Sequence, residues 1–234
     1  MSAHPQHVGR VPTHGGNPEG AKESSGWKVV KSGELFSFVT SGSRGWAKYY
    51  SDSGPAFLRV GNLDHDSISL DLRDIQRVQP PSGTEGTRTR VSPADILISI
   101  TADVGMVGIV PENFEEAYIN QHVSLARPVS TVHPPYLAWC LSSPPAQQQF
   151  RELQRGATKV GLGLGDISAI DVPLPSLPEQ RRIVAEIEKQ FTRLEAGVAA
   201  LRRVQANLKR YRAAVLSACL KCQNEPMFMR VGGA

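Results

Sequence analysis

Three prolines, at positions 173, 175 and 178, stand directly before a long stretch of sequence without proline. Proline has no backbone N–H donor and restricts the residue before it to extended conformations, so helix is favoured only beyond these prolines. Ser176 can cap such a helix, and Glu179, three residues later, completes a capping box. The sequence therefore predicts that a globular region, residues 27–178, ends here and that one helix occupies residues 179–221.

The predicted helix carries apolar residues at alternating spacings of four and three, which is the heptad pattern of a coiled coil. After Leu201 one spacing is shortened and the apolar line continues through Val204, as in a stammer. Alternatively, the first frame continues, with polar Gln205 and Arg212 at core positions. The predicted seam comprises Ile187, Phe191, Leu194, Val198, Leu201, Leu208 and Val215, and the shortened spacing adds Val204 and Tyr211.

The length of the predicted helix indicates that its apolar seam needs a partner. A helix of about 42 residues is roughly 63 Å long. A domain of about 150 residues is too small to cover the whole stripe. The sequence therefore predicts a partner helix, and an amphipathic helix folded back on its own domain is the alternative.

Composition limits the class of protein. Of 234 residues, 40% are hydrophobic and 21% are charged, which is typical of globular proteins, and no apolar run is long enough for a membrane span. Residues 1–26 are rich in Gly, Pro, Ser and His and predict a disordered leader, and residues 222–234 a flexible tail. Three cysteines are too few for a disulfide framework and favour the reducing cytoplasm. Cys219 and Cys222 form a single C-x-x-C without a second pair, so we expect no metal site.

Charge is distributed unevenly along the chain. Residues 179–221 contain ten Lys/Arg and four Asp/Glu, whereas residues 27–178 contain thirteen and fifteen. Non-specific DNA affinity comes from neutralising phosphates with Lys and Arg. The slightly acidic globular region therefore argues against DNA binding through a general positive charge. Recognition of DNA by local clusters of cationic and polar residues stays open.

Several short segments have the composition of such clusters. The loop 42–50 combines two cations and three aromatics between flexible residues, and cations can hold phosphates or guanine edges. Residues 87–90 place two arginines on one face if the segment is extended, and residues 155–160 form a basic turn. An ordinary loop anchored by its aromatics, or a solvated edge, is the alternative in each case. The candidate DNA-binding residues are Ser43, Arg44, Trp46, Lys48, Tyr49, Arg59, Asn62, Arg88, Arg90, Asn120, Gln121, Thr158 and Lys159.

Apolar periodicity predicts a mixed α+β domain in which strands come first and helices near the end. The predicted strands are 56–62, which ends in a turn, 95–100, 104–110, 117–119, 122–125 and 167–172, and the predicted helices are 135–141 and 146–153.

The chain resembles half of a DNA-specificity subunit of type I restriction-modification systems, with one target-recognition domain and one helical spacer. The most specific match is the L-P-E-Q-x-x-I-V signature, here Leu177 to Val184. Weaker matches arrive in the same order: Gly33-Glu34-Leu35, the strand Ala94 to Ser99 (with Ala94 where the family usually has glycine), Asn120-Gln121-His122-Val123 and Gly156-Ala157-Thr158.

The resemblance implies a non-catalytic subunit that reads a bipartite site in double-stranded DNA. It implies as partners a methyltransferase subunit using S-adenosylmethionine and a restriction subunit using ATP and Mg²⁺, with no cofactor in this chain. It also implies helix pairing, as an antiparallel homodimer or with a second specificity half.

Two motifs point instead to an enzyme. His133-Pro134-Pro135-Tyr136 is similar to the N/D-P-P-Y motif of adenine methyltransferases, but histidine does not supply the required acceptor. The glycine run 161–166 is similar to a cofactor loop, but a strand and prolines are predicted to follow it where a helix is needed. A methyltransferase fragment and a coiled-coil adaptor without a DNA role are the alternative functions.

Overall fold

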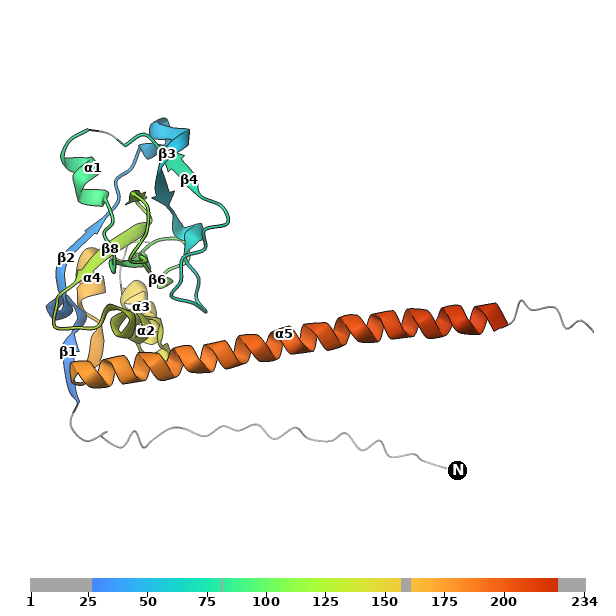
Figure 1. Cartoon of the computed structure of the whole chain (residues 1–234). Helices are drawn as coiled ribbons and strands as arrows, with labels where there is room; N and C mark the ends of the chain where they lie inside the picture. The colour runs from blue at the N-terminus through green and yellow to red at the C-terminus, as the bar shows by residue number, and fades with distance from the viewer. Residues whose placement is uncertain (1–26, 81, 157–160, 223–234) are drawn as a thin grey trace, which may run out of the picture.

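A computed structural model describes residues 27–222 except 81 and 157–160, and shows a β-rich domain from which one long helix projects (Figure 1). The predicted α+β architecture is confirmed. In chain order the elements are β1 (Lys28–Lys31), η1 (Ser32–Leu35), β2 (Phe36–Ser41), η2 (Trp46–Tyr49), β3 (Tyr50–Leu58), η3 (Val60–Asn62), β4 (Gln76–Val78), α1 (Thr84–Thr89), β5 (Ile96–Ser99), β6 (Val107–Ile109), β7 (Ala117–Ile119), β8 (Val123–Pro128), α2 (Pro134–Ser142), α3 (Pro144–Gly156), α4 (Leu164–Ser168), β9 (Asp171–Leu174) and α5 (Leu177–Cys222).

Within the described residues the strands form three sheets, with orders β2-β8-β5-β6, β4-β3-β7 and β1-β9. The central strand β5 is buried on both faces because its residues are all apolar except the last. Successive side chains point to opposite faces of a strand. Ile96 and Ile98 accordingly join one hydrophobic cluster, which α2 and α3 cover, and Leu97 joins a second.

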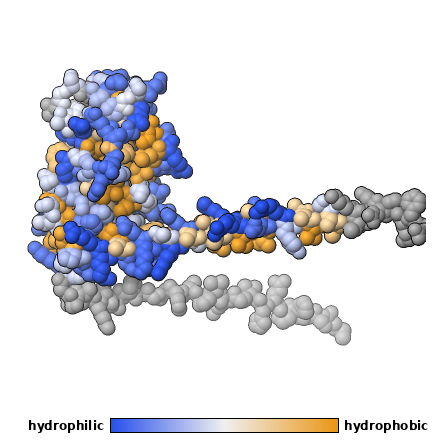
Figure 2. Space-filling model, viewed as in Figure 1, coloured by the Kyte–Doolittle hydropathy of each residue, from blue (hydrophilic) through white to orange (hydrophobic). Residues whose placement is uncertain are grey.

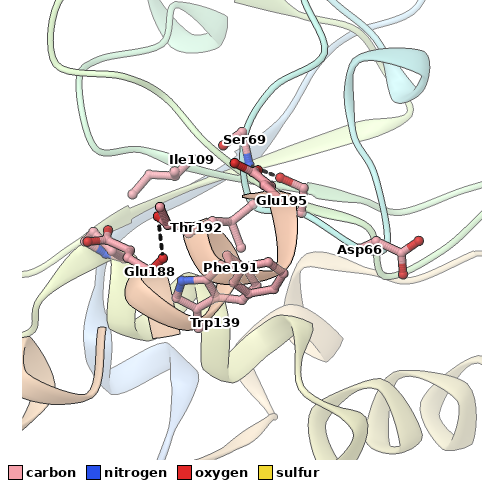
Figure 3. Close-up of a pocket in the computed structure, with 11 residues that line it drawn as sticks. Asp66, Ser69, Ile109, Trp139, Glu188, Phe191, Thr192 and Glu195 are labelled. Carbon is pink, nitrogen blue, oxygen red and sulfur yellow. Dashed lines mark hydrogen bonds between the residues drawn. The ribbon is translucent and has the colours of Figure 1, made fainter. Parts of the chain in front are cut away.

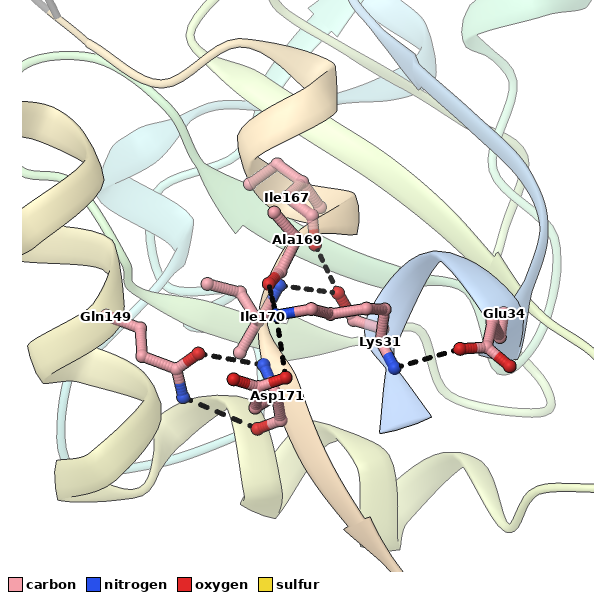
Figure 4. A network of polar contacts seen from close by, with 8 residues as sticks. Lys31, Glu34, Gln149, Ile167, Ala169, Ile170 and Asp171 are labelled. Carbon is pink, nitrogen blue, oxygen red and sulfur yellow. Dashed lines mark hydrogen bonds and ion pairs between the residues drawn. The ribbon is translucent and has the colours of Figure 1, made fainter. Parts of the chain in front are cut away.

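The first and last strands of the domain, β1 and β9, pair with each other (Figure 4), and β1 lies near the start of α5 (Figure 1). The Lys31 Nζ lies 2.7 Å from the Asp171 carboxylate, and the Ser32 hydroxyl donates to the Ile167 carbonyl oxygen at 2.6 Å. The Gln149 side chain accepts a bond of 2.8 Å from the backbone N–H of Asp171. These contacts close the domain at the point from which the long helix departs.

One predicted strand, at residues 167–172, is wrong in part. Residues 164–168 form helix α4, because the Asp166 carboxylate accepts the Gly163 backbone N–H at 2.7 Å and caps a turn there, so the last strand starts only at Asp171. The strand ending in a turn that is predicted for residues 56–62 is confirmed, because β3 ends at Leu58 and Val60–Asn62 is a 3₁₀ turn closed by the Asn62 side chain. Both turns depend on side-chain acceptors that interrupt an apolar pattern.

Helix α5 begins at Leu177, two residues before the predicted start, because proline is tolerated in the first turn of a helix. The Ser176 carbonyl oxygen accepts the first helical bonds, and the Glu179 carboxylate pairs with Arg182 instead of completing a capping box. Gln180, in the signature motif, is 1% exposed. Its side chain accepts from the His133 backbone at 2.8 Å and donates to the Pro175 carbonyl at 2.9 Å. The motif thus fixes the helix to α2 and to the proline segment.

The early part of the predicted seam also contacts the chain's own domain, so only part of the surface of Phe191, which is 38% exposed, is open to a partner. Phe191 stacks on Trp139 with ring centroids 5.1 Å apart and an interplanar angle of 15°. Ile187 lines an apolar pocket together with Trp139 and Ile183. The reason is the fixed entry angle of α5, which lays its first turns along α2.

Beyond Phe191 the apolar seam is exposed. Leu194, Leu201 and Leu208 are 62%, 70% and 62% exposed. Figure 2 shows apolar residues along the projecting part of α5, among hydrophilic ones. Among the described residues, no helix is long and apolar enough to cross a membrane.

Candidate nucleic-acid interface

The loop 42–50 is anchored to the domain by an aromatic side chain. Trp46 is 2% exposed and stacks on Phe57 at 5.1 Å with an interplanar angle of 8°. It also lies 5.5 Å from the ring of Tyr118. Trp46 is therefore unavailable to a base or a sugar, and we remove it from the candidate DNA contacts. Aromatic–aromatic packing of this kind fixes the loop at its base.

Close backbone packing holds the start of the same loop. A Cβ built on Gly42 would lie 2.2 Å from the backbone of Asn120, so only glycine fits there. Gly45 has φ +85°, a left-handed conformation that favours glycine. The loop therefore has a defined shape rather than a free one.

Both cations of this loop lie at its surface. Arg44 and Lys48 are exposed, and the Lys48 ammonium lies 4.9 Å from the centroid of the half-buried Tyr49 ring. With β3, β4 and α1, the loop belongs to the end of the domain opposite α5 (Figure 1). A rigid loop that presents two cations away from the helix is suited to contact phosphates or base edges.

Arg88 and Arg90 would share one face only in an extended segment, and that condition is not met, because Thr84–Thr89 form helix α1. Arg88 points back to the loop: its guanidinium donates to the Ser41 carbonyl oxygen and the Ser43 hydroxyl, each at 2.7 Å, and also to the Thr40 hydroxyl. Arg88 and Ser43 thus position the loop. Arg90 is exposed, with its guanidinium 3.7 Å from the Glu116 carboxylate.

Three more candidates have roles within the fold. Asn62 is 2% exposed and donates to the carbonyl oxygens of Asp71 and Asp74 at 2.8 and 3.0 Å. Arg59 pairs with Asp74 at 3.4 Å. Asn120 is 8% exposed and accepts the His122 backbone N–H at 3.0 Å. We remove Asn62 and Asn120 from the DNA contacts because their polar groups are buried and hydrogen-bonded inside the domain.

Of the remaining candidates, Gln121 is half-buried, with its side-chain amide 2.9 Å from the His122 ring. Thr158 and Lys159 lie outside the described residues.

The structure adds a groove that the sequence pattern does not predict, with a volume of about 510 Å³. Phe38 is 39% exposed in it, and the Arg127 guanidinium lies 5.8 Å from its ring centroid. Phe38 and Arg127 face each other because β2 pairs with β8. The groove is lined by Ser37, Phe38, Thr87, Arg88, Arg90 and Arg127.

Arg127 is held in place by a buried carboxylate. The Asp95 side chain is 0% exposed and accepts two bonds of 2.7 Å from the Arg127 guanidinium, which raise the pKa of Arg127. The Ser92 backbone N–H also donates to Asp95, at 2.6 Å. A fixed guanidinium beside an exposed aromatic ring can contact a phosphate or stack against a base. A carboxylate at the start of a buried strand needs a cationic or hydrogen-bonding partner. Asp95 in the predicted strand 95–100 is therefore the sequence feature that indicates a cation nearby.

The two enzyme-like motifs have structural roles. His133 occupies the N-cap position of α2 without a side-chain capping bond, and Tyr136 is 3% exposed, with its hydroxyl donating to the Pro173 carbonyl oxygen at 2.7 Å. The glycine run leads into α4 rather than directly into a strand, which corrects the expectation, but that helix has only five residues. Among the described residues, no group of three or more His, Cys, Asp or Glu could hold a metal ion.

Residues 24–200 match the family described as "Type I restriction modification DNA specificity domain". The type I restriction enzyme EcoBI specificity subunit of Escherichia coli is 29% identical over 145 residues, 59% of this chain and 29% of that protein. The StySPI specificity subunit of Salmonella potsdam is 24% identical over 177 residues, 74% of this chain and 37% of that protein.

Solved structures show the same similarity. The HsdS subunit from Thermoanaerobacter tengcongensis is 25% identical with a TM-score of 0.56, over 85% of this chain and 46% of that chain. A chain from a structure on complex assembly and conformational transition of the type I R-M system is 24% identical with a TM-score of 0.64, over 86% and 47%. The matched region spans less than half of each of these four proteins.

Proposed function

Because the chain belongs to the family of type I restriction-modification DNA specificity domains, we propose that it is a non-catalytic component that reads a DNA sequence for such a system. The observation that carries the proposal is the rigid loop 42–50, which presents Arg44 and Lys48 at the end of the domain opposite α5. The adjoining groove of Phe38, Arg90 and Arg127 extends this surface. Phosphate contacts position such a domain, and side chains in the grooves of DNA specify the sequence.

Helix α5 supplies the second part of the proposal. Its exposed seam serves as spacer and docking surface for another helix, so that two recognition domains read the halves of a bipartite site. The partners are a methyltransferase subunit and a restriction subunit, acting in the cytoplasm. S-adenosylmethionine, ATP and Mg²⁺ are bound by those subunits and not by this chain. The relatives that are named specificity subunits support these assignments.

Replacing both Arg44 and Lys48 by alanine is expected to weaken specific binding about 10- to 100-fold, since a base-reading arginine contributes about 1–3 kcal/mol and a phosphate contact adds less. Binding to the cognate duplex is measured by fluorescence anisotropy, with thermal melting as the folding check. Lys28→Ala with Arg151→Ala is the matched control, because it removes the same charge from exposed positions outside the loop. Equal affinity of the two double variants would exclude the loop from DNA contact.

The spacing of the target tests the role of α5. If two copies pair through antiparallel helices, the dimer has twofold symmetry and the target is an interrupted palindrome. One heptad added between the domain and the twofold axis in both copies moves each domain outward by about 10 Å, and is expected to widen the gap by up to about 6 base pairs. Methylation mapping of a genome carrying the system measures the symmetry of the target and the length of its gap. An asymmetric site, or a gap unmoved by the insertion, contradicts pairing of two copies.

A further inference from the structure

The spacings of the seam on α5 read the same in both directions from Leu201. The apolar residues are Ile187, Phe191, Leu194, Val198, Leu201, Val204, Leu208, Tyr211 and Val215. Their spacings are 4, 3, 4, 3 and then 3, 4, 3, 4. An uninterrupted heptad repeat allows many equivalent registers, whereas this pattern has a single centre.

A seam that is symmetric about one residue is suited to an interface between two identical antiparallel helices. In a twofold interface, residue i contacts residue j and residue j contacts residue i. An antiparallel pair centred on Leu201 therefore sets Leu194 against Leu208 and Val198 against Val204 of the second copy. Phe191 then meets Tyr211, and Ile187 meets Val215. Every position of the seam receives an apolar partner, without placing Gln205 or Arg212 in the core.

Charge favours the same arrangement. The four carboxylates of residues 179–221 all precede Leu201, and six of the ten cations follow it. An antiparallel pair lays the cationic half of one helix along the half of the other that carries the carboxylates. A parallel pair would set the cationic halves side by side. Like charges at flanking positions destabilise a coiled coil and opposite charges set its orientation.

Individual charged residues beside the seam show the same complementarity between the two halves of the helix. Glu188, Thr192 and Glu195 lie along one flank of the N-terminal half. In an antiparallel twofold pair the same flanks face each other, which brings the second copy's flank next to them. That flank carries Arg202, Lys209 and Arg212, with Gln205 between them.

Next to this flank the domain forms an acidic pocket of about 450 Å³ (Figure 3). Asp66 from the domain and Glu188 and Glu195 from α5 line it, beside the stacked rings of Trp139 and Phe191. The register places the second copy's Lys209 and Arg212 on this side. Ile187, which meets the second copy's Val215, also lines an apolar pocket of about 380 Å³ that contains Trp27 and Trp139.

We infer that α5 pairs with α5 of a second copy, antiparallel, with Leu201 on the twofold axis. This inference rests on the proposed role of α5 as a pairing element, and it fixes the partner and the register. The far end of each helix then lies beside the other copy's domain, next to the Trp139–Phe191 stack.

Single cysteines in the full chain test the register, with Cys140, Cys219 and Cys222 replaced by serine. Under mild oxidation Leu201→Cys is expected to form a covalent dimer, because only a residue on the axis meets its own copy. Leu194→Cys alone and Leu208→Cys alone are expected to stay monomeric on non-reducing gels, whereas a mixture of the two cross-links. Disulfides require Cα atoms within about 7 Å, so neighbouring registers are excluded.

Each other outcome overturns the inference. Covalent dimers from all three single variants indicate a parallel pair. A Leu201→Cys chain that fails to cross-link while Leu201→Cys and Gln205→Cys chains cross-link with each other indicates the uninterrupted frame. Failure of every variant indicates a different partner. These positions are exposed, so the variants are expected to fold, as checked by thermal melting. Site-specific methylation with the partner subunits, measured separately, shows whether the proposed DNA-reading function stands without this register.

Discussion

Replacing both Leu194 and Leu201 by aspartate is expected to abolish helix pairing and with it the site-specific modification that depends on two recognition domains. Each change places a carboxylate in the apolar seam, and burying an unpaired charge costs several kcal/mol. In a symmetric pair both copies carry both changes, so four carboxylates enter one interface. Sedimentation is expected to show the mass of a single chain, and methylation of the target is expected to fall below detection.

Two controls separate loss of helix pairing from loss of folding and from the added charge. Leu194 and Leu201 are 62% and 70% exposed, so the domain itself is expected to melt at an unchanged temperature. Asn207→Asp and Ala213→Asp add the same charge to the projecting helix outside the seam, and are expected to leave the mass of the assembly unchanged. An identical sedimentation mass for the seam variant and the unaltered chain would contradict the coiled-coil interpretation.

Replacing Asp95 by alanine is expected to lower the free energy of unfolding by about 2–4 kcal/mol, which is the largest stability effect that we expect from a single polar residue here. Asp95 is fully buried and accepts bonds from the Ser92 backbone and twice from the Arg127 guanidinium. Its removal leaves those donors without their acceptor. The cost stays below that of a fully buried pair because the Arg127 side chain is 38% exposed and regains water.

Urea unfolding measures this effect. Asp52→Ala, which removes an exposed carboxylate, is expected to change the stability by less than about 0.5 kcal/mol. Since Arg127 also lines the groove with Phe38, Asp95→Ala is expected to weaken DNA binding at temperatures where the domain is still folded. Equal stability of the Asp95 and Asp52 variants would show that the buried pair makes no net contribution.

The features that local sequence signals specify were predictable. The proline segment sets the start of α5 to within two residues, and the apolar runs at 95–100 and 117–119 give β5 and β7. The resemblance rests on the signature motif, and the structure gives its glutamine a physical role: Gln180 ties the helix to the backbone of α2.

The parts that depend on long-range pairing were not predictable. Trp46 has the composition of a surface contact, but its burial depends on Phe57 and Tyr118, which the fold brings to it. Arg88 lies in helix α1 and donates to Ser41 and Ser43, more than forty positions away, and no local signal in the sequence indicates these bonds. The groove of Phe38 and Arg127 exists only because β2 and β8 pair in one register, which a single sequence does not fix.

The attachment of α5 at one end makes it a lever. Thirty-one residues follow Phe191 within the helix, and they span about 46 Å. A change of about 4° in the angle at the Trp139–Phe191 stack moves the far end by about 3 Å, which is close to the rise of one base pair. If two half-sites are read through α5 as proposed, the angular stiffness of this attachment contributes to the precision with which their spacing along DNA is set. Substitutions at Trp139, far from any base, would be felt as tolerance in the length of the gap.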